Sequence, residues 1–215
     1  MKKFAVILCG CGHLDGSEIH ESTMTLLAID KHGHSYTVFA PDEDQYDVIN
    51  HLTKEPMDEK RNMLVEAARI ARGEISPLSD FNPDKFDALI FPGGFGAAKN
   101  LFTYAQKGVK MQVRDDINAI IKQMHQKGKP IGALCISPVL LAKVLQDIVI
   151  TVGTDPATAA DVQKLGARHI NTQQTEVIAD KQNMVFSTPC YMLPARLSDI
   201  EESAYNLIGT ILENL

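Results

Sequence analysis

The chain has 215 residues, of which 45% are hydrophobic and 22% are charged, and this composition excludes an intrinsically disordered protein. Its 21 Lys and Arg residues against 27 Asp and Glu residues give a net charge of -6, which argues against DNA or RNA as a partner. No apolar run approaches the roughly 20 residues that cross a bilayer, so no membrane partner is expected either. The four cysteines are too few for a disulfide scaffold, and we expect free thiols in a cytoplasmic protein.

The chain begins with the pattern of a strand, a helix and a second strand. Phe4–Leu8 is a nearly continuous apolar run, which is typical of a strand buried on both faces of a parallel sheet. Ser17 is the predicted N-cap of the helix that follows, and Gly33 is predicted to end it. Ser35–Phe39 predicts the second strand, so these residues form one βαβ unit.

The same alternation of strands and helices continues to the end of the chain. Further strands are predicted at Phe86–Phe91, Ile131–Leu134, Val149–Val152, Glu176–Ala179 and Met184–Ser187, the last two as a hairpin-like pair. Further helices are predicted at Arg61–Arg72, Arg114–Gln126, Val139–Leu145, Pro156–Leu165 and Leu197–Leu212. No linker or repeat divides the chain. We therefore predict a single domain over residues 1–215, an α/β doubly wound three-layer sandwich with a mostly parallel sheet.

The segment Gly132–Pro138 contains the first candidate for chemistry. A buried strand that turns sharply into a helix places the residue at the turn, Cys135, in a strained conformation with its side chain in the cleft. The helix N-terminus is expected to favour the thiolate and to lower the pKa of Cys135. The alternative is a buried structural cysteine, and this segment alone favours neither interpretation.

Two other loops follow strands and are expected at the same edge of the sheet. In Pro92–Gly96, a backbone N–H of Gly93 or Gly94 could join the N–H of Ile136 in an oxyanion hole beside Cys135. The loop after the first strand ends with two acids, Glu18 and Glu21, spaced to share a helix face. Such acids are also favoured by the helix dipole alone, whatever their function.

Taken together, these segments resemble the PfpI superfamily, which shares its elbow with class I glutamine amidotransferases. The resemblance is carried by Phe91–Gly94, by Ala133–Ile136 and by a glutamate on the first helix. The longer segments Asp15–Glu21, Pro92–Leu101 and Gly153–Pro156 are similar to a bacterial branch named for isoprenoid biosynthesis. The resemblance covers essentially the whole chain and implies a flavodoxin-like, class I amidotransferase-like fold.

The resemblance also implies a role for each site residue. Cys135 corresponds to the nucleophile of the family, Gly94 and Ile136 to its oxyanion positions, and Glu21 to the acidic partner, with Glu18 as the alternative. The chain departs from the glutaminases, because the histidines of a Cys-His-Glu triad are absent from the expected positions. That difference argues against glutamine hydrolysis. Only His20 and His169 could replace the missing histidine, and only if the fold brings either close to the thiol.

The activity that the resemblance implies is a cofactor-independent, glutathione-independent glyoxalase of the hydro-lyase type, together with a debated deglycase activity. Cys135 would form a hemithioacetal with a small aldehyde or dicarbonyl such as glyoxal, Glu21 would move a proton, and glycolate would leave. No metal is expected, because His13 with Cys9 and Cys11 makes only a weak cluster. By analogy with relatives, the protein is expected to be a homodimer.

Two other functions stay open from the sequence. In the first, Cys135 is oxidised in a redox sensor or stress-response binding protein, with Cys190 as a resolving cysteine if the fold brings the two together. In the second, the protein is a non-catalytic partner in isoprenoid biosynthesis. The second predicts that loss of the Cys135 thiol leaves the biological phenotype unchanged.

Overall fold

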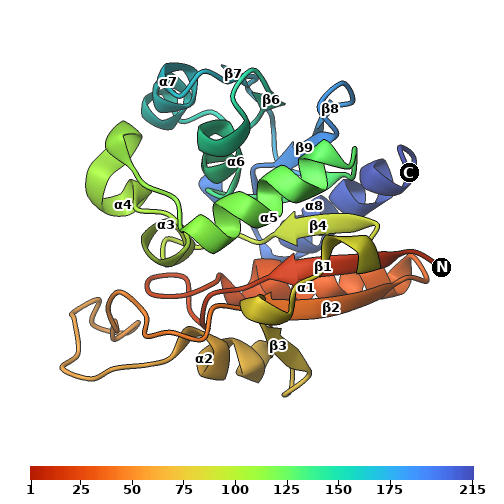
Figure 1. Ribbon diagram of the computed structural model, residues 1–215. Helices are drawn as coiled ribbons and strands as arrows, with labels where there is room; N and C mark the ends of the chain where they lie inside the picture. The colour runs from red at the N-terminus through yellow and green to blue at the C-terminus, as the bar shows by residue number, and fades with distance from the viewer.

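A seven-stranded sheet runs through the computed structural model, which describes residues 1–215 (Figure 1). The strand order is β3-β2-β1-β4-β5-β9-β8, and only the β8–β9 pair is antiparallel. The strands of this sheet are β1 (Lys3–Ile7), β2 (Ser35–Ala40), β3 (Ile75–Pro77), β4 (Ala88–Phe91), β5 (Ile131–Leu134), β8 (Ile178–Asp180) and β9 (Val185–Thr188). A second, two-stranded sheet consists of β6 (Val149–Ile150) and β7 (Arg168–His169).

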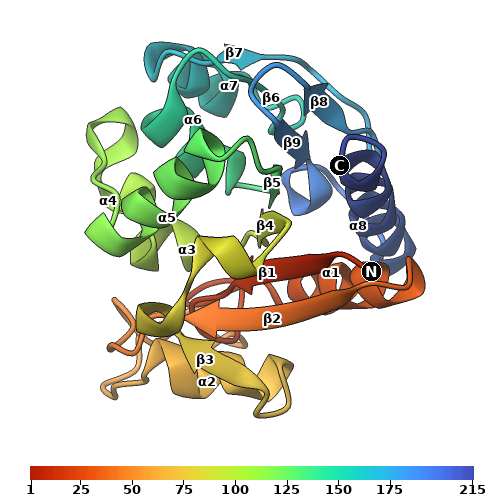
Figure 2. The same ribbon diagram turned by 45° about the vertical axis from the view of Figure 1, so that its right-hand side comes forward.

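Helices cover both faces of the large sheet, as Figures 1 and 2 show. The helices are α1 (Ile19–Lys31), α2 (Met63–Ile70), α3 (Ala97–Asn100), α4 (Tyr104–Lys107), α5 (Asp115–Gln126), α6 (Pro138–Leu145), α7 (Pro156–Lys164) and α8 (Leu197–Leu212). Helices α1, α2 and α8 lie on one face, and α5 and α6 lie on the other. The predicted fold class is therefore confirmed: the protein is a three-layer α/β sandwich with a mostly parallel sheet and flavodoxin-like topology. None of the helices combines the length and apolar character that a bilayer crossing requires.

The central strands are buried on both faces because their side chains are apolar on both faces. Phe4 on β1 pairs with Tyr36 on β2 and with Ala88 on β4, so β1 has a neighbour on each side. Every residue of Phe4–Leu8 is fully buried, as the continuous apolar run predicts. These residues belong to a cluster of 53 buried hydrophobic residues that joins the sheet to both helical layers.

The start of the first helix differs from the prediction. Glu18, rather than Ser17, is the N-cap of α1, and its side chain accepts a hydrogen bond from the backbone N–H of Glu21. The Ser17 hydroxyl accepts instead from the backbone N–H of Cys9, at 2.9 Å. Ser17 therefore accepts the hydrogen bond of a backbone N–H just after β1. The helix starts one residue later than predicted from the preference for serine at the N-cap.

Other elements are shorter than predicted or were missed. The predicted strand Val149–Val152 is reduced to β6. In the large sheet β9 already occupies the edge of β5, and β6 pairs instead with β7 in the small sheet. The predicted helix Arg61–Arg72 begins at Met63, after the N-cap Asn62. The sequence prediction missed β3, β7, α3 and α4, whose two to four residues are too few for a hydrophobic period to be visible.

Candidate active site

The site lies where four strands of the large sheet end. Strands β1, β4, β5 and β9 are mutually parallel, so the loops after Ile7, Phe91, Leu134 and Thr188 meet at one edge of the sheet (Figure 2). Ligands in open α/β sheets bind at this edge. The three loops that were singled out from the sequence are therefore brought together by the topology.

The loop after β5 forms the predicted elbow. Cys135 has a positive φ of 60°, a conformation that non-glycine residues rarely adopt and that surrounding structure must hold in place. Its backbone N–H donates to the Thr188 carbonyl at 3.0 Å, and the buried Ser137 hydroxyl donates to the Pro92 carbonyl at 2.8 Å. These bonds tie the elbow to β9 and to the loop after β4. The Cys135 side chain is only 7% exposed, and what is exposed faces a cavity.

Glu21 lies in the first turn of α1, fully buried beside Cys135. One carboxyl oxygen, Oε2, accepts from the backbone N–H of Gly93 at 2.8 Å, and the other, Oε1, accepts from that of Tyr191 at 3.3 Å. The absence of a side chain at Gly93 makes this packing possible, because a Cβ there would lie 2.4 Å from the Cys135 Cβ and 2.7 Å from Glu21 Oε2. Backbone donors from two distant loops therefore hold the carboxyl group against the thiol.

Glu18 has a different position and different partners. Its Oε2 accepts from the Glu21 N–H at 2.6 Å, so one oxygen is committed to capping α1. Its backbone N–H donates to the Gly93 carbonyl at 2.9 Å, and its side chain lines the cavity. Of the two acids that the sequence left as alternatives, Glu21 is the one that the structure places in contact with Cys135.

The backbone N–H groups of Gly94 and Ile136 form a candidate oxyanion hole. Both lie near the Cys135 sulfur and favour its thiolate, and neither donates to a backbone carbonyl. Gly94 has a φ of 114°, and a Cβ at that position would meet the backbone of Gly16 and Glu18, so a glycine is required there. Of the two glycines that the sequence left as alternatives, Gly93 uses its N–H to bind Glu21, which leaves Gly94 as the candidate donor beside Ile136.

The pKa values of the two buried acids follow from their burial and their proximity. Burial raises the pKa of Glu21 from 4.5 to about 8, and the nearby Glu18 carboxylate acts in the same direction. Burial also raises the pKa of Cys135 well above its ordinary value, followed by the effect of the Glu21 charge, while the N–H groups of Gly94 and Ile136 oppose the shift. The expected lowering of the Cys135 pKa is therefore wrong: the backbone donors are present, but desolvation outweighs them. At neutral pH both groups are therefore mainly protonated, and the Glu21 carboxyl is the first of the two to lose its proton as the pH rises.

A buried asparagine holds the loop that leads into α1. The Asn100 amide donates to the carbonyls of Cys9 and Asp15 at 3.3 Å and 2.8 Å, and its oxygen accepts from the Tyr46 N–H at 2.8 Å. The Asp15 carboxylate accepts from the Ile49 N–H at 2.8 Å. This network joins the loop after β1 to α3 and to the segment after β2, and so positions the start of α1.

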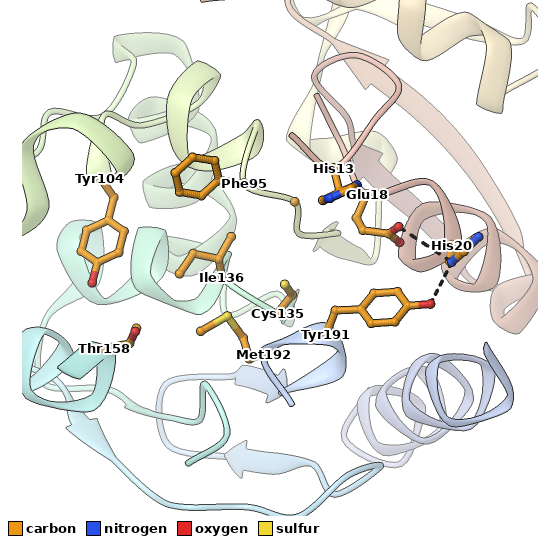
Figure 3. A pocket seen from close by; sticks show the side chains of 11 residues that line it. His13, Glu18, His20, Phe95, Tyr104, Cys135, Ile136, Thr158, Tyr191 and Met192 are labelled. Carbon is orange, nitrogen blue, oxygen red and sulfur yellow. Dashed lines mark hydrogen bonds and ion pairs between the residues drawn. The ribbon is translucent and has the colours of Figure 1, made fainter. Parts of the chain in front are cut away.

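A cavity of about 650 Å³ opens onto Cys135 (Figure 3). Six of its lining residues were not identified from the sequence: His13, Phe95, Tyr104, Thr158, Tyr191 and Met192. Phe95 and Tyr104 belong to the short turn and helix after β4, where no sequence pattern distinguishes a cavity wall from a surface loop. Only the glycines before Phe95 indicated that a ligand could approach there.

The histidines do not complete a triad. His20 lines the cavity, but its Nδ1 lies 2.8 Å from the Tyr191 hydroxyl and 3.9 Å from Glu18 Oε1, and Figure 3 shows its ring beyond Tyr191 as seen from Cys135. His169 lies outside the cavity, where its Nε2 accepts from the Val152 N–H at 3.1 Å. The acid–base group beside the thiol is therefore the Glu21 carboxyl rather than an imidazole.

The other cysteines have separate surroundings. Cys190 is fully buried after β9, close enough to Cys135 and Glu21 for their charges to raise its pKa, after the larger effect of burial. Cys9 is fully buried against Ser17, and its pKa is raised to about 11 by burial. Cys11 is partly exposed and lines no part of the cavity. All four thiols are free, and no group of three or more metal-binding side chains is present.

Comparisons with known proteins bear on the family and the fold of the chain. The sequence profile of the DJ-1/PfpI family matches residues 6–192. The human protein named glutamine amidotransferase-like class 1 domain-containing protein 3, mitochondrial, is 41% identical over 221 residues, which cover 98% of this chain and 82% of the relative. A deglycase of Thermococcus kodakarensis is 35% identical over 106 residues, covering 48% of this chain and 54% of that protein.

A crystal structure that is 33% identical in sequence matches over the full length. It is that of an isoprenoid biosynthesis protein with an amidotransferase-like domain from Ehrlichia chaffeensis. The TM-score is 0.93 at 33% sequence identity, and the superposition covers 99% of this chain and all of the other. A chain so similar over its entire length has the same order of strands and helices around the same strand ends.

Proposed function

The chain belongs to the DJ-1/PfpI family, and from its site we propose that it is a cofactor-independent, glyoxalase-like enzyme that converts glyoxal to glycolate. The observation that carries the proposal is the contact between the Cys135 thiol and the buried Glu21 carboxyl, beneath two unpaired backbone N–H groups, at the wall of a cavity. Within the family, we place the chain in the isoprenoid-associated branch represented by ElbB, a placement that the full-length match to the Ehrlichia protein supports.

The first step is the addition of the thiol to an aldehyde. As the Cys135 sulfur bonds to the aldehyde carbon, Glu21 in its ionised form accepts the thiol proton, and the carbonyl π electrons move to oxygen. The N–H groups of Gly94 and Ile136 point at the sulfur and are free to bind that oxygen. Protonation of the oxygen completes the hemithioacetal. A pKa of about 8 makes Glu21 able both to accept and to return a proton near neutral pH.

The second step moves a proton between the two carbons of the substrate. Glu21 removes the proton from the carbon that bears sulfur, the electron pair shifts toward the second carbonyl, and the proton returns to that second carbon. The product is a thioester of glycolate on Cys135. Water then breaks the carbon–sulfur bond, glycolate leaves, and the thiol regains its proton. Glyoxal and water together contain all the atoms of glycolate, so the reaction needs no external oxidant or metal.

The same groups could also act on early adducts of dicarbonyls with amines, in which the sulfur displaces the amine from a hemiaminal carbon. The name of the Thermococcus relative, a deglycase, supports including this activity in the proposal. The second substrate class is distinguished by the release of a free amine, which the glyoxalase reaction does not produce.

The test is glycolate production from glyoxal by purified, reduced protein without metal or thiol cofactor. Cys135→Ala should abolish turnover, and Glu21→Gln should reduce it at least about 100-fold, because a neutral amide cannot move the proton. Cys11→Ser is the matched control, since that thiol lies outside the cavity. In D₂O, transfer through Glu21 should place solvent deuterium in the CH₂ group of glycolate, which NMR detects. Equal turnover by wild type and Cys135→Ala would refute the mechanism.

A redox role for Cys135 has one observation in its favour, the burial of Cys190 close to it. The raised pKa of Cys135 opposes this role, because oxidation by peroxide starts from the thiolate. A sensor would lose peroxide sensitivity in Cys190→Ser while keeping its turnover. A non-catalytic partner in isoprenoid biosynthesis would show an unchanged phenotype in Cys135→Ala.

The remaining parts of the proposal concern location and assembly. The reaction needs a reduced Cys135, so we propose a reducing compartment: the cytoplasm, with the mitochondrial matrix as the alternative that the name of the human relative suggests. A homodimer is proposed by analogy within the family, and light scattering of the purified protein tests it. A small aldehyde or dicarbonyl is the expected partner, and nucleic acid is not, given the net charge of -6.

A further inference from the structure

The cavity at Cys135 is larger than glyoxal requires. Its volume is about 650 Å³, within the range of roughly 300–1,000 Å³ that holds ligands of drug size. Glyoxal consists of two carbons and two oxygens and fills only a small part of this volume. With glyoxal bound, most of the cavity volume would stay unfilled, and a larger substrate could place a substituent there.

The two sides of the cavity differ in chemistry. Figure 3 shows His13, Glu18 and His20 on one side of Cys135, and Phe95 and Tyr104 on the other. The second side also contains Ile136 and Met192, so its surface is mainly apolar and aromatic. A substituent directed away from the acids would lie between aromatic rings, an isoleucine and a thioether, all of which pack well against a flat ring.

The aromatic side is held in place before any ligand arrives. The Tyr104 hydroxyl donates to Asp161 Oδ2 at 2.9 Å, which fixes the ring against α7. Phe95 is 51% exposed, and the ammonium group of Lys99 lies 5.2 Å from the centre of its ring. Lys99 is itself paired with Asp47 at 2.6 Å. A fixed, half-exposed aromatic surface at the rim of a catalytic cavity binds an apolar group at a small entropic cost.

The charges around the cavity exclude an anionic substituent. No lysine or arginine is among the lining residues, while Glu18 lines the cavity and Glu21 lies directly behind Cys135. Burial lowers the pKa of His13, and the neighbouring His51 adds to this effect, so a positive charge on His13 is disfavoured. A phosphate or carboxylate on the substrate would meet the Glu18 carboxylate with no lysine or arginine on the cavity wall to offset it.

We infer that the site accepts α-oxoaldehydes whose ketone carbon carries an aromatic ring, with the ring packed against Phe95, Tyr104 and Met192. The inference rests on the proposed function, because it assigns a substrate to the same thiol and carboxyl group. With phenylglyoxal, sulfur adds to the aldehyde carbon, Glu21 moves the proton from that carbon to the ketone carbon, and water releases mandelate. Phenylglyoxal and water contain all the atoms of mandelate, so the balance is the same as for glyoxal.

The test compares glyoxal, methylglyoxal and phenylglyoxal as substrates of the purified protein, with glycolate, lactate and mandelate measured by chromatography. The value of kcat/KM should be at least about tenfold higher for phenylglyoxal than for glyoxal, with methylglyoxal between them. Phe95→Ala should lower the ratio of kcat/KM for phenylglyoxal over glyoxal about five- to tenfold. Phe95→Tyr, which keeps the ring, should restore the wild-type ratio.

The outcomes separate the inference from the proposed function. If glyoxal is turned over but phenylglyoxal is not preferred, or if Phe95→Ala lowers both substrates equally, the inference is overturned and the glyoxalase proposal stands. If no substrate is turned over, the proposed chemistry fails. The inference about the aromatic side of the cavity is then tested by ligand binding alone. Saturation-transfer NMR with acetophenone and the Cys135→Ala protein should then show contact with the aromatic ring that Phe95→Ala removes. Absence of that contact overturns the inference.

Discussion

The replacement Glu21→Gln tests the burial of the acid independently of any activity. In the folded protein the pKa of Glu21 is raised from 4.5 to about 8, so the folded state binds more protons than the unfolded state between these two values. The contribution of Glu21 to stability is therefore greatest below pH 4.5, falls as the pH rises, and is lost above about pH 8. Glutamine does not titrate, so the variant has no such loss.

The size of the effect follows from the same two pKa values. Each tenfold change in proton affinity corresponds to about 1.4 kcal/mol, so a pKa moved from 4.5 to about 8 corresponds to at most about 5 kcal/mol. The whole free energy of unfolding of a domain is typically about 5–15 kcal/mol. Wild type should thus lose several kcal/mol relative to Glu21→Gln between pH 5 and pH 8.

The assay is urea unfolding at a series of pH values, followed by circular dichroism because the chain has no tryptophan. The observable is the difference between wild type and variant, because every other titrating group is common to both. His13, His34 and His169, whose pKa values are lowered mainly by burial, change stability in the opposite direction and cancel in this difference. If the difference in unfolding free energy between wild type and variant changed by less than about 1 kcal/mol across this pH range, Glu21 would not be buried as an acid.

Two other replacements test the geometry. Gly93→Ala places a Cβ 2.4 Å from the Cys135 Cβ, so the thiol and carboxyl must separate by about 1 Å, which should lower kcat/KM about 100-fold. Gly209→Ala on α8, where the nearest atom outside the helix is 3.4 Å away, should leave kinetics intact, and equal rates for the two variants would contradict the packing at Gly93. Asn100→Ala removes three hydrogen bonds and leaves the carbonyls of Cys9 and Asp15 buried, so urea unfolding should show a loss of about 2–4 kcal/mol; a change below 0.5 kcal/mol would argue against the network.

The sheet and the elbow could be predicted because their signals are local. The apolar run Phe4–Leu8, the small residues before Cys135 and the glycines after Phe91 each require a particular backbone, whatever the rest of the chain does. The choice between Glu18 and Glu21 needed the structure. Both are acids in the same helical turn, and only the contacts of Gly93 and Tyr191 with the Glu21 carboxyl separate them.

The protonation of the site could not be predicted, because it depends on burial. A helix N-terminus behind Cys135 predicts a lowered pKa, and its donors are present, yet the 7% exposure of the side chain and the adjacent acid reverse the direction. The aromatic side of the cavity was missed for a related reason. Phe95 and Tyr104 lie on short segments that only long-range packing fixes, and no helical or strand period marks them.

The two backbone bonds to Glu21 also bear on how the protein matures. The donors at Gly93 and Tyr191 lie 72 and 170 residues farther along the chain. While the chain is being synthesised, α1 can form early, but its acid stays hydrated and titrates as an ordinary carboxylic acid until the segment after β9 has emerged and docked. The non-local contacts that complete the site therefore form late in folding. A chain that ends before this segment would keep Cys135 and Glu21 in its sequence and still lack the buried carboxyl beside the thiol on which the proposed chemistry depends.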